Sequence, residues 1–351
     1  MKAIRVFQWA SGTVGRHAAK AVLERPDMDF VGLHVTNPEK VGQDVGMLVG
    51  SKNTGIAATN DVELILRSDA DVVVHAPLPS MVYGDDPLRD LDDICRLLAG
   101  GMNVITVVGY LYPKAHGPEV LKRLTDACAR GSSSFHSTGL NPGWMGDLVP
   151  LFMSGLMRRL DHVHVLEISN FEHYPSPEIM FGSMGFGATP KEFAAKNQRR
   201  SEWLNSLFRE SVWMVADGLG RAPDRVDSTM EMAIAETDLQ TAAGVVKAGT
   251  VAGQHWTWTG VIAGKPRIVH ETVWRMHSSV APDWAHGRHR ITLKGEPGMH
   301  LEFDANYVTD GLQATAMHAV NAIPLVCAAD AGIRTLLDLP WTTGRGSLSL
   351  G

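Results

Sequence analysis

Apolar runs alternate with stretches of helical periodicity through the first 130 residues of the chain. The β-rich runs are Ile4–Trp9, Phe30–Val35, Asp71–Ala76 and Asn103–Val108. Apolar positions at three- and four-residue spacing predict helices from Thr13 to about Glu24, Leu88 to Leu98 and Pro118 to Ala129. Strands that alternate with helices are typical of βαβ units around a parallel sheet covered on both faces. We therefore predict an α/β first domain over residues 1–145.

The pattern changes after a turn-rich junction at Asn141–Asp147. An apolar stretch predicts a helix from about Leu148 to Leu160. Beyond Gly244, paired β-rich runs surround glycine and proline turns and predict two hairpins, 254–259 with 267–274 and 289–293 with 299–303. Four antiparallel strands with helices on one face give an α+β second domain over residues 146–314. The apolar helix from Thr315 to about Ala331 begins a segment, 315–351, that we expect to return to the first domain.

Composition narrows the functional classes. The chain has 351 residues, 44% hydrophobic residues and a net charge of −6, which is ordinary for a globular protein. Nothing in the charge pattern favours a nucleic acid or a membrane surface as partner, so we expect a small-molecule substrate. The apolar N-terminal run is too short and too interrupted for a signal peptide, and no stretch approaches the ~20 apolar residues of a membrane span. We expect a cytoplasmic protein.

Cysteine and histidine spacing gives no sign of a metal site. Cys95, Cys128 and Cys327 lie far apart in apolar helical stretches, which is typical of buried free thiols. The pairs His162/His164 and His286/His289 have no third ligand at a suitable spacing. We therefore predict no bound metal.

The strongest chemical signal is the turn Ala10-Ser-Gly-Thr-Val-Gly-Arg16, which follows the first strand and opens the first helix. A dinucleotide pyrophosphate binds backbone N–H groups at a helix N-terminus, and it needs a turn without obstructing side chains. Gly12 and Gly15 fit that need, and Ala18 is a third small residue for helix–strand packing. The predicted pyrophosphate contacts are Ser11, Gly12, Thr13, Val14 and Gly15. The first domain is therefore expected to be a doubly wound Rossmann domain.

The end of the second strand indicates which dinucleotide is preferred. NAD-specific sites usually place an acidic residue there to bind the ribose 2′-hydroxyl. This strand ends in Val35-Thr-Asn-Pro-Glu-Lys40, where Thr36, Asn37 and Lys40 suit a 2′-phosphate and Glu39 opposes it. We predict that NADP(H) is preferred and that NAD(H) remains possible.

Several motifs resemble the dihydrodipicolinate reductase-like family of oxidoreductases, and within it 2,4-diaminopentanoate dehydrogenase and the native amine dehydrogenases. The motifs span nearly the whole chain: 12–16, 35–42, 141–143, 167–174, 184–187 and 320–324. The resemblance implies a substrate domain with an open mixed, largely antiparallel sheet and a homodimer formed through that sheet. It also implies hydride transfer between NAD(P)H and a C=N or C=O carbon.

The resemblance also implies a glutamate just after the strand 103–108, where it would orient ammonia and take up a proton. The segment Thr106–Pro113 contains no acidic residue, and Gly109 or a neighbour occupies that place. The His-His pair of the dihydrodipicolinate reductases does not occur in this chain either. The sequence thus departs from the family at the position expected to carry acid–base chemistry.

Other residues at the strand ends and the domain junction are candidates for cofactor or substrate contact. The candidate catalytic groups are Tyr112, against a pocket-lining role, and Glu167, with Glu172 behind it. Ala76 and Asn141 are further candidates for the cofactor, Asn141 against a turn-forming role. The candidates for substrate contact are Gly109, Trp144, Asn170, Tyr174 and His270. For these the alternatives are a junction filler at Trp144, a solvated loop at 170–174 and an ordinary sheet histidine at His270.

Together these features predict an NAD(P)H-dependent oxidoreductase that acts on a C=O or C=N bond of a small, mainly apolar molecule, in either direction. Reductive amination with ammonia is one version of this reaction. The absence of an obvious acid–base group leaves one alternative, a catalytically silent NADP(H)-binding sensor or scaffold.

Overall fold

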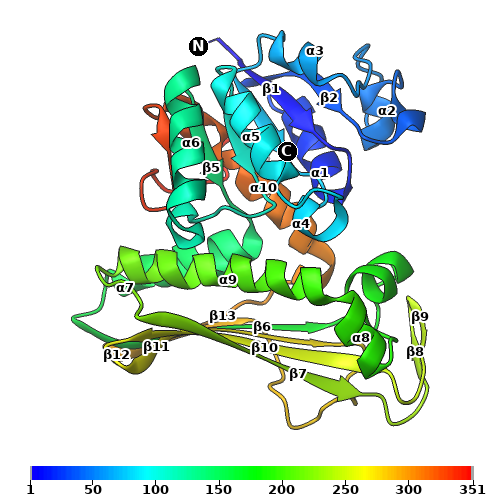
Figure 1. The fold of residues 1–351 in the computed structure, drawn as a ribbon, viewed down its shortest axis with the longest axis vertical. Helices are drawn as coiled ribbons and strands as arrows, with labels where there is room; N and C mark the ends of the chain where they lie inside the picture. The colour runs from blue at the N-terminus through cyan, green and yellow to red at the C-terminus, as the bar shows by residue number, and fades with distance from the viewer. Residues whose placement is uncertain (1, 349–351) are drawn as a thin grey trace. The chain divides into compact units, whose positions relative to one another are not determined.

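The computed structural model describes residues 2–348 and divides into two compact units. The first unit comprises residues 1–144 with 312–351, and the second comprises residues 145–311. Figure 1 shows the fold of each unit.

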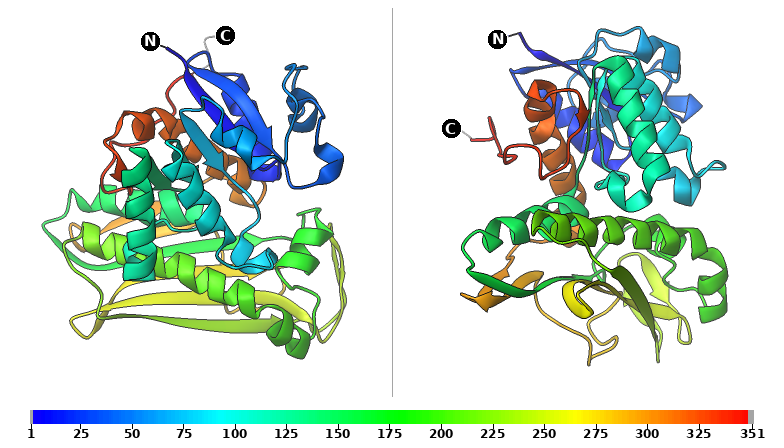
Figure 2. Two further views of the ribbon diagram at one scale, coloured as in Figure 1. Left: turned by 45° about the horizontal axis from the view of Figure 1, so that its top comes forward. Right: turned by 60° about the vertical axis from the view of Figure 1, so that its left-hand side comes forward.

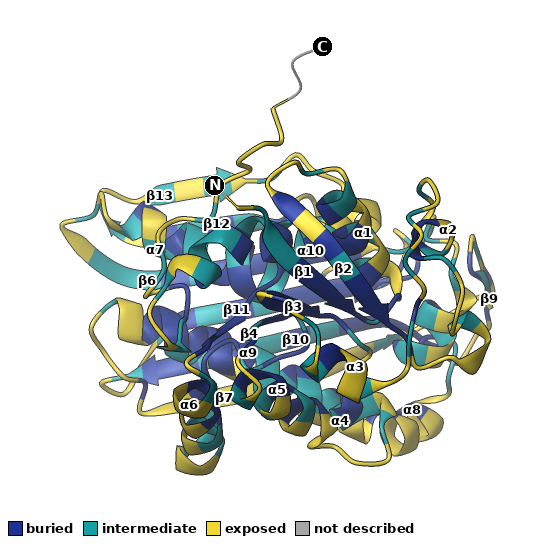
Figure 3. Cartoon of the chain, turned by 90° about the horizontal axis from the view of Figure 1, so that it is seen from above, coloured by how far each residue is buried: buried dark blue, intermediate teal, exposed yellow. Residues whose placement is uncertain are grey.

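The first unit is built on a parallel sheet in the strand order β14-β5-β4-β3-β1-β2. Its strands are β1 (Ile4–Trp9), β2 (Met28–His34), β3 (Val72–His75), β4 (Asn103–Thr106), β5 (Ser134–Ser137) and β14 (Gly332–Ile333). Strands β1 and β3 are buried along almost their whole length, as Figure 3 shows, because helices cover both faces of the sheet. This is the doubly wound arrangement that the sequence predicts.

Two apolar layers hold the helices to this sheet. Helices α1 (Thr13–Leu23) and α10 (Tyr307–Ala328) pack on one face with Val6, Leu33 and Ile105. Helices α5 (Arg89–Ala99) and α6 (Pro118–Gly131) pack on the other face. Figure 2 shows the two layers. Ala319 and Ile323 of α10 belong to the first of these layers.

Short elements fill the connections of the first unit. They are η1 (Pro38–Lys40), α2 (Val45–Val49), α3 (Val62–Leu66), α4 (Ser80–Tyr83), η2 (Pro113–His116) and the irregular η3 (Leu140–Leu148), which runs into the second unit.

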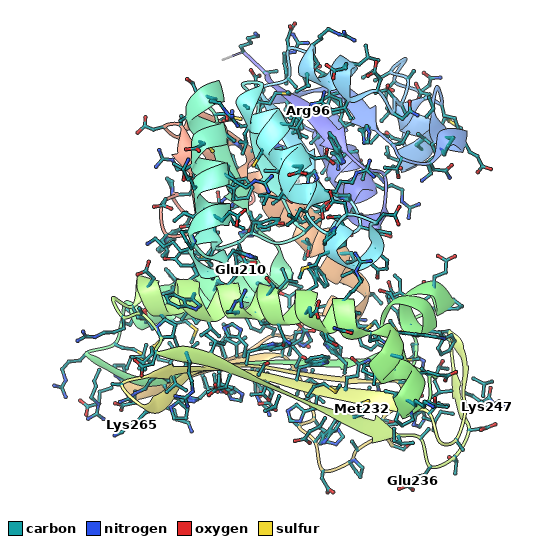
Figure 4. The ribbon with its side chains drawn as sticks, in the orientation of Figure 1. Arg96, Glu210, Met232, Glu236, Lys247 and Lys265 are labelled. Carbon is teal, nitrogen blue, oxygen red and sulfur yellow. The ribbon has the colours of Figure 1, made fainter. Side chains whose placement is uncertain are left out.

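The second unit contains a mixed sheet in the order β13-β12-β6-β11-β10-β7. Its strands are β6 (Arg159–Asn170), β7 (Arg225–Ile234), β10 (Val251–Ile262), β11 (Lys265–Arg275), β12 (Arg290–Glu296) and β13 (Met299–Glu302), with the separate pair β8 (Leu239–Thr241) and β9 (Gly244–Val246). Strands β6 and β11 run parallel, whereas the other pairs are antiparallel. In Figure 4, Lys265 marks one end of this sheet, and Glu236 and Lys247 mark the other.

Helix α9 (Gln198–Gly218) lies along one face of this second sheet. Its Phe208 ring stacks on Trp258 of β10 with the ring centroids 3.9 Å apart. The other helical segments are α7 (Val149–Ser154), η4 (Glu178–Ser183) and α8 (Pro190–Lys196). Within residues 2–348, no helix has both the length and the apolar character needed to cross a membrane.

The structure confirms both predicted hairpins, β10–β11 and β12–β13, and corrects two other expectations for this unit. The helix predicted over 148–160 ends at Ser154, and Arg159 already begins β6. The four predicted antiparallel strands are only part of the sheet, since β6 and β7 join it. The parallel pairing of β6 with β11 makes the sheet mixed and largely antiparallel, as the family resemblance implied. Strand β7 was missed by sequence reasoning, which took its methionines Met230 and Met232 as apolar filling, whereas most residues of this edge strand are exposed.

Candidate nucleotide and substrate sites

The turn between β1 and α1 presents backbone amides at a helix N-terminus. Gly12 is the N-cap, and the first α-helical hydrogen bond runs from Arg16 N–H to the Gly12 carbonyl at 2.8 Å. The N–H groups at the start of the helix precede any intrahelical acceptor, so they are available to an anion. The predicted contacts Ser11, Thr13 and Val14 lie in this turn.

The two glycines of this turn meet different steric demands. A Cβ on Gly15 would lie 2.1 Å from the Ala10 carbonyl oxygen, so the turn can close over the helix only with glycine at this position. A Cβ on Gly12 would meet no atom within 4 Å, so the space beside Gly12 is open to a ligand. Gly15 therefore maintains the turn, and Gly12 leaves room for a pyrophosphate.

Gln8 stabilises the turn through its side chain, a role that sequence reasoning did not identify. Its fully buried side-chain amide donates to the carbonyl oxygens of Trp9 at 3.0 Å and Ala10 at 3.2 Å. These bonds satisfy a backbone that reaches a φ of +76° at Ala10, outside the usual range of an L-residue. A polar residue among the buried positions Val6–Trp9 of the strand was the one available signal.

The loop after β2 brings a cation to this turn. Asn37 caps η1 by accepting a hydrogen bond from Glu39 N–H at 2.9 Å, which fixes the turn that carries Lys40. Lys40 Nζ then donates to Ser11 Oγ at 3.1 Å. Thr36 and Asn37 are exposed beside it. An ammonium group next to open backbone amides is suited to a phosphate on the ribose.

Further candidates for cofactor and substrate contact follow the next strands of the first sheet. Ala76 follows β3, is buried, and donates its N–H to the Trp9 carbonyl at 3.1 Å. Gly109 follows β4 with a φ of +139°, which favours glycine, and its carbonyl accepts the Ser137 hydroxyl at 2.7 Å. The carboxyl ends of parallel strands are where such sheets bind ligands.

Tyr112, Asn141 and Trp144 lie in the loops beyond these strands. Tyr112 is 2% exposed, and Lys114 Nζ lies 5.6 Å from the centre of its ring. Asn141 is extended, with a φ of −154° inside the irregular η3 segment. The backbone N–H of Trp144 donates to the Gly139 carbonyl at 3.0 Å. Their roles in cofactor binding, catalysis or substrate contact stay predictions.

Helix α10 supports the loop that carries Asn141. Thr315 Oγ1 accepts the Leu140 N–H at 3.2 Å, and Thr138 Oγ1 lies 2.6 Å from His318 Nδ1. Burial lowers the pKa of His318 to about 4, so its ring is neutral at physiological pH. The C-terminal segment thus positions a loop of the candidate site as well as covering the sheet.

In the second unit, a polar cluster interrupts the apolar sheet face that α9 covers. We define the Glu167 cluster as Glu167, Thr272, Trp274 and His289. Trp274 Nε1 donates to Glu167 Oε1 at 2.7 Å, and the Arg200 guanidinium of α9 lies 5.5 Å from the Trp274 ring centre. The register pairs Thr272 with Glu167 and Arg290 with Leu166, which places His289 opposite Glu167. Glu167 therefore points to the α9 side of the sheet.

His270, the predicted substrate contact on β11, lies in the interior of the second unit. It is fully buried beneath α9, with Ser211 Oγ 3.4 Å from its Nε2 and the Phe208 ring 6.0 Å away. The same Ser211 hydroxyl donates to the buried Asp147 carboxylate at 2.6 Å. Burial lowers the pKa of His270 to about 3. The role of His270 in substrate contact stays a prediction, for a ring that is fully buried in this structure.

Asn170 and Tyr174 lie apart from the Glu167 cluster. Asn170 ends β6 on the opposite side of the strand from Glu167, is exposed, and accepts the Glu172 N–H at 3.0 Å. Tyr174 packs edge-on against Phe171 at 6.1 Å. The Glu172 carboxylate lies 3.5 Å from His277 Nε2, so Glu172 pairs with His277 and is not part of the Glu167 cluster.

His289, Trp274 and Thr272 were missed by sequence reasoning as partners of Glu167. They are 122, 107 and 105 residues away along the chain, and only the strand register brings them together. Among residues 2–348, no group of three His, Cys, Asp or Glu side chains is arranged to hold a metal ion.

Comparison with known proteins shows the family to which the chain belongs. Residues 145–346 match the 2,4-diaminopentanoate dehydrogenase C-terminal domain, and residues 9–85 match the N-terminus of dihydrodipicolinate reductase. The chain is 31% identical to an amine dehydrogenase of Streptomyces virginiae, over 98% of each chain. It is 24% identical to the 2,4-diaminopentanoate dehydrogenase of Acetoanaerobium sticklandii, over 97% of this chain and 94% of the other.

A solved structure supports the fold. The amine dehydrogenase of Mycobacterium smegmatis superposes with a TM-score of 0.78 at 22% identity, over 97% of each chain. The family resemblance seen in the sequence motifs is confirmed by these matches. The chain belongs to the family of amine dehydrogenases and 2,4-diaminopentanoate dehydrogenases, and it is an NAD(P)-dependent oxidoreductase.

Proposed function

We propose that this protein is an NADP(H)-dependent oxidoreductase that interconverts a small, mainly apolar amine with the corresponding imine or ketone. The dinucleotide, when bound, supplies or accepts the hydride. The observation that carries the cofactor preference is the Lys40 ammonium 3.1 Å from Ser11 Oγ, beside the open space at Gly12. The names of the relatives support a C–N bond as the reacting group.

The residues of the first unit fit such a dinucleotide. The amides of residues 13–15 would bind the pyrophosphate, and Gly12 would admit it closely. Lys40 and Ser11 would bind a 2′-phosphate through charge-assisted hydrogen bonds. No side chain at the end of β2 supplies the carboxylate that usually selects the 2′-hydroxyl of NAD, apart from the exposed Glu39, whose backbone is turned into η1.

The experiment compares NADPH and NADH binding by nucleotide fluorescence in wild type and in Lys40→Ala. A charged hydrogen bond contributes about 1.5–3 kcal/mol, so NADPH binding should weaken about 10- to 100-fold while NADH binding changes little. Lys20→Ala removes the same charge from the exposed far end of α1 and should leave both affinities unchanged. Equal losses for the two nucleotides in Lys40→Ala would refute the 2′-phosphate assignment.

Turnover separates the oxidoreductase from the silent sensor that the sequence left open. Apolar ketones are offered to the NADPH-loaded protein with and without ammonia, and NADPH oxidation is followed. Turnover that requires ammonia supports the amine reaction. Tight NADPH binding without turnover on any ketone would favour the sensor.

A further inference from the structure

The segment between β11 and β12 packs on the face of the second sheet opposite the Glu167 cluster. We call this segment, residues 276–288, the strap. Its Trp284 contacts three buried residues of that face, Leu166, Ile168 and Val273. A Cβ on Gly253 of β10 would lie 3.0 Å from the Trp284 ring, so the strap lies close against the strands. Side chains between the strap and the sheet are therefore shielded from solvent.

Arg275, the last residue of β11, is buried under the strap without a counterion. It is 2% exposed, and among residues 2–348 its guanidinium bonds only to two carbonyl oxygens and one imidazole. Burial lowers the pKa of Arg275. Buried charges in proteins are normally paired, because an isolated one is costly to remove from water. An unpaired guanidinium in this position indicates a counterion that binds from outside the chain.

The guanidinium keeps one edge free for such an ion. Nη1 donates to the Ala285 carbonyl at 3.0 Å and to His286 Nδ1 at 3.3 Å, so both of its hydrogens are used. Nη2 has one contact, to the Ala281 carbonyl at 3.4 Å, and the buried Nε has none. The Nε–H and one Nη2–H are thus without acceptors. Neighbouring guanidinium N–H groups bind two oxygens of one carboxylate or phosphate.

The strap can open at the residue that contacts this edge. Ala281 has a φ of +46°, a conformation that L-residues rarely adopt. Its carbonyl oxygen also accepts the Trp284 N–H at 3.0 Å, so it stays bonded when the contact with Arg275 is lost. An oxyanion can therefore replace the 3.4 Å contact of Arg275 without leaving the carbonyl unpaired.

A second arginine contacts the same part of the strap. Arg290 of β12 donates through Nη1 to the His286 carbonyl at 3.3 Å and, within the described residues, forms no ion pair. Arg288 differs, since the Asp304 carboxylate lies 3.1 Å from its Nη2. Two unpaired guanidinium groups that both contact His286 favour an ion with more than one negative charge.

We propose that Arg275 and the strap form a second ligand site, which binds a small oxyanion, phosphate, on the Nε–Nη2 edge of Arg275. Arg290 supplies a further positive charge, and Ala281 moves away from the guanidinium as the ion enters. The site is formed by the second unit alone, and it does not depend on the proposed oxidoreductase function.

The first test measures the affinity of the full chain for inorganic phosphate by titration calorimetry. NADPH is present in excess, so that phosphate does not bind at the turn beside Gly12, and sodium chloride keeps the ionic strength constant. Arg275→Gln should weaken phosphate binding about 10- to 100-fold, because two charged hydrogen bonds are lost. Arg290→Gln should weaken it about 2- to 5-fold, as expected for a partly exposed charge.

Arg288→Gln is the matched control, because it removes an arginine of the same strap that is already paired with Asp304. Its affinity for phosphate should equal that of wild type. Acetate, with a single negative charge, should bind wild type more weakly than phosphate. Acetate binding as tight as phosphate binding would overturn the choice of phosphate as the ligand.

The second test locates the ion by hydrogen exchange and mass spectrometry. Phosphate should slow the exchange of the strap amides in wild type and have a much smaller effect in Arg275→Gln. If Arg275→Gln does not fold, the strap exchange of wild type and the affinity of Arg290→Gln decide the question. Absence of phosphate binding in wild type, unchanged affinity in Arg275→Gln, or strap exchange that does not respond to phosphate would overturn the site.

Discussion

At the scale of single residues, Gly12 and Gly15 show that one short motif can serve two physical purposes. Gly15 is required by the fold, because any Cβ would strike the Ala10 carbonyl. Gly12 is unconstrained by the protein, with a φ of −66° and open space around it. The protein itself would accommodate a side chain at Gly12, so we attribute the glycine to the close approach of a ligand.

Alanine at these two glycines should therefore separate stability from binding. Gly15→Ala should lower the free energy of unfolding by about 1–3 kcal/mol, as overpacking does. Gly12→Ala should leave that free energy nearly unchanged and sharply weaken NADPH binding, because the methyl group occupies the pyrophosphate position. Urea unfolding and nucleotide fluorescence measure the two effects. Normal NADPH affinity in Gly12→Ala would contradict the placement of the pyrophosphate.

At the scale of elements, the contact between α9 and the second sheet depends on a gap left by glycine. Gly260 of β10 faces α9, and a Cβ there would lie 2.5 Å from Val212 Cγ1. Val212 is fully buried, so it has no space into which to move. The helix approaches the strand closely at this point because neither element projects a larger side chain.

Substitutions at this contact should be non-additive. Gly260→Ala should destabilise the protein by about 1–3 kcal/mol, and Val212→Ala should destabilise it by leaving a cavity. The double variant should be more stable than the sum of the two losses predicts, because the new methyl group enters the space that valine vacates. Unfolding free energies of the three variants measure the coupling. Strict additivity would mean that α9 shifts away from β10 instead.

At the scale of the whole molecule, buried histidines link folding to pH. Burial lowers the pKa of His75 and His270 to about 3, and the pKa of His34, His136 and His318 to about 4, from a usual value of 6.5. These rings stay neutral in the folded chain and bind protons in the unfolded one. Their stabilising contribution is complete above about pH 6.5 and is lost as the pH falls toward 4 and below.

We therefore expect the free energy of unfolding to fall steeply between pH 6.5 and about 4. Each buried histidine contributes a slope of up to about 1.4 kcal/mol per pH unit within that window. His270→Gln should reduce the slope, because one proton fewer is taken up on unfolding. Urea unfolding at a series of pH values measures both slopes. A stability that is flat or rises as the pH falls would contradict this account.

The homodimer expected from the family resemblance is also a proposal about the whole molecule. The sheet face opposite the Glu167 cluster carries half-buried side chains, among them His164 and His255, which bond to the two oxygens of Glu271 at 2.7 and 2.8 Å. These bonds lower the pKa of Glu271 to about 2. We propose that a second copy of the chain covers this face.

Val269 lies on that face in β11 and is partly exposed, so Val269→Arg should place a charge inside the proposed interface and yield monomers in sedimentation. Lys265→Ala, at the exposed β10–β11 turn, should leave the oligomeric state unchanged. A Val269→Arg protein with the sedimentation of wild type would exclude this face as the interface.

The sequence by itself determined the features that depend on neighbouring residues. The strand–glycine turn–helix at residues 4–23, the alternation of strands and helices around the first sheet and the two hairpins are local patterns, and the structure contains each of them. A turn and its flanking strands are specified by a few adjacent residues, so periodicity and glycine placement were sufficient signals.

Tertiary structure alone decided which distant residues meet. The parallel pairing of β6 with β11 brings the Trp274 indole into hydrogen-bond distance of Glu167. The loop after β2 brings the Lys40 ammonium to the Ser11 hydroxyl, and packing of α9 on the sheet buries His270. Each of these contacts joins segments separated by tens to more than a hundred residues, and no local pattern encodes the register between them. A shift of one residue in that register would move every side chain to the other face of the sheet, so the Glu167 cluster exists only once the whole second sheet has formed.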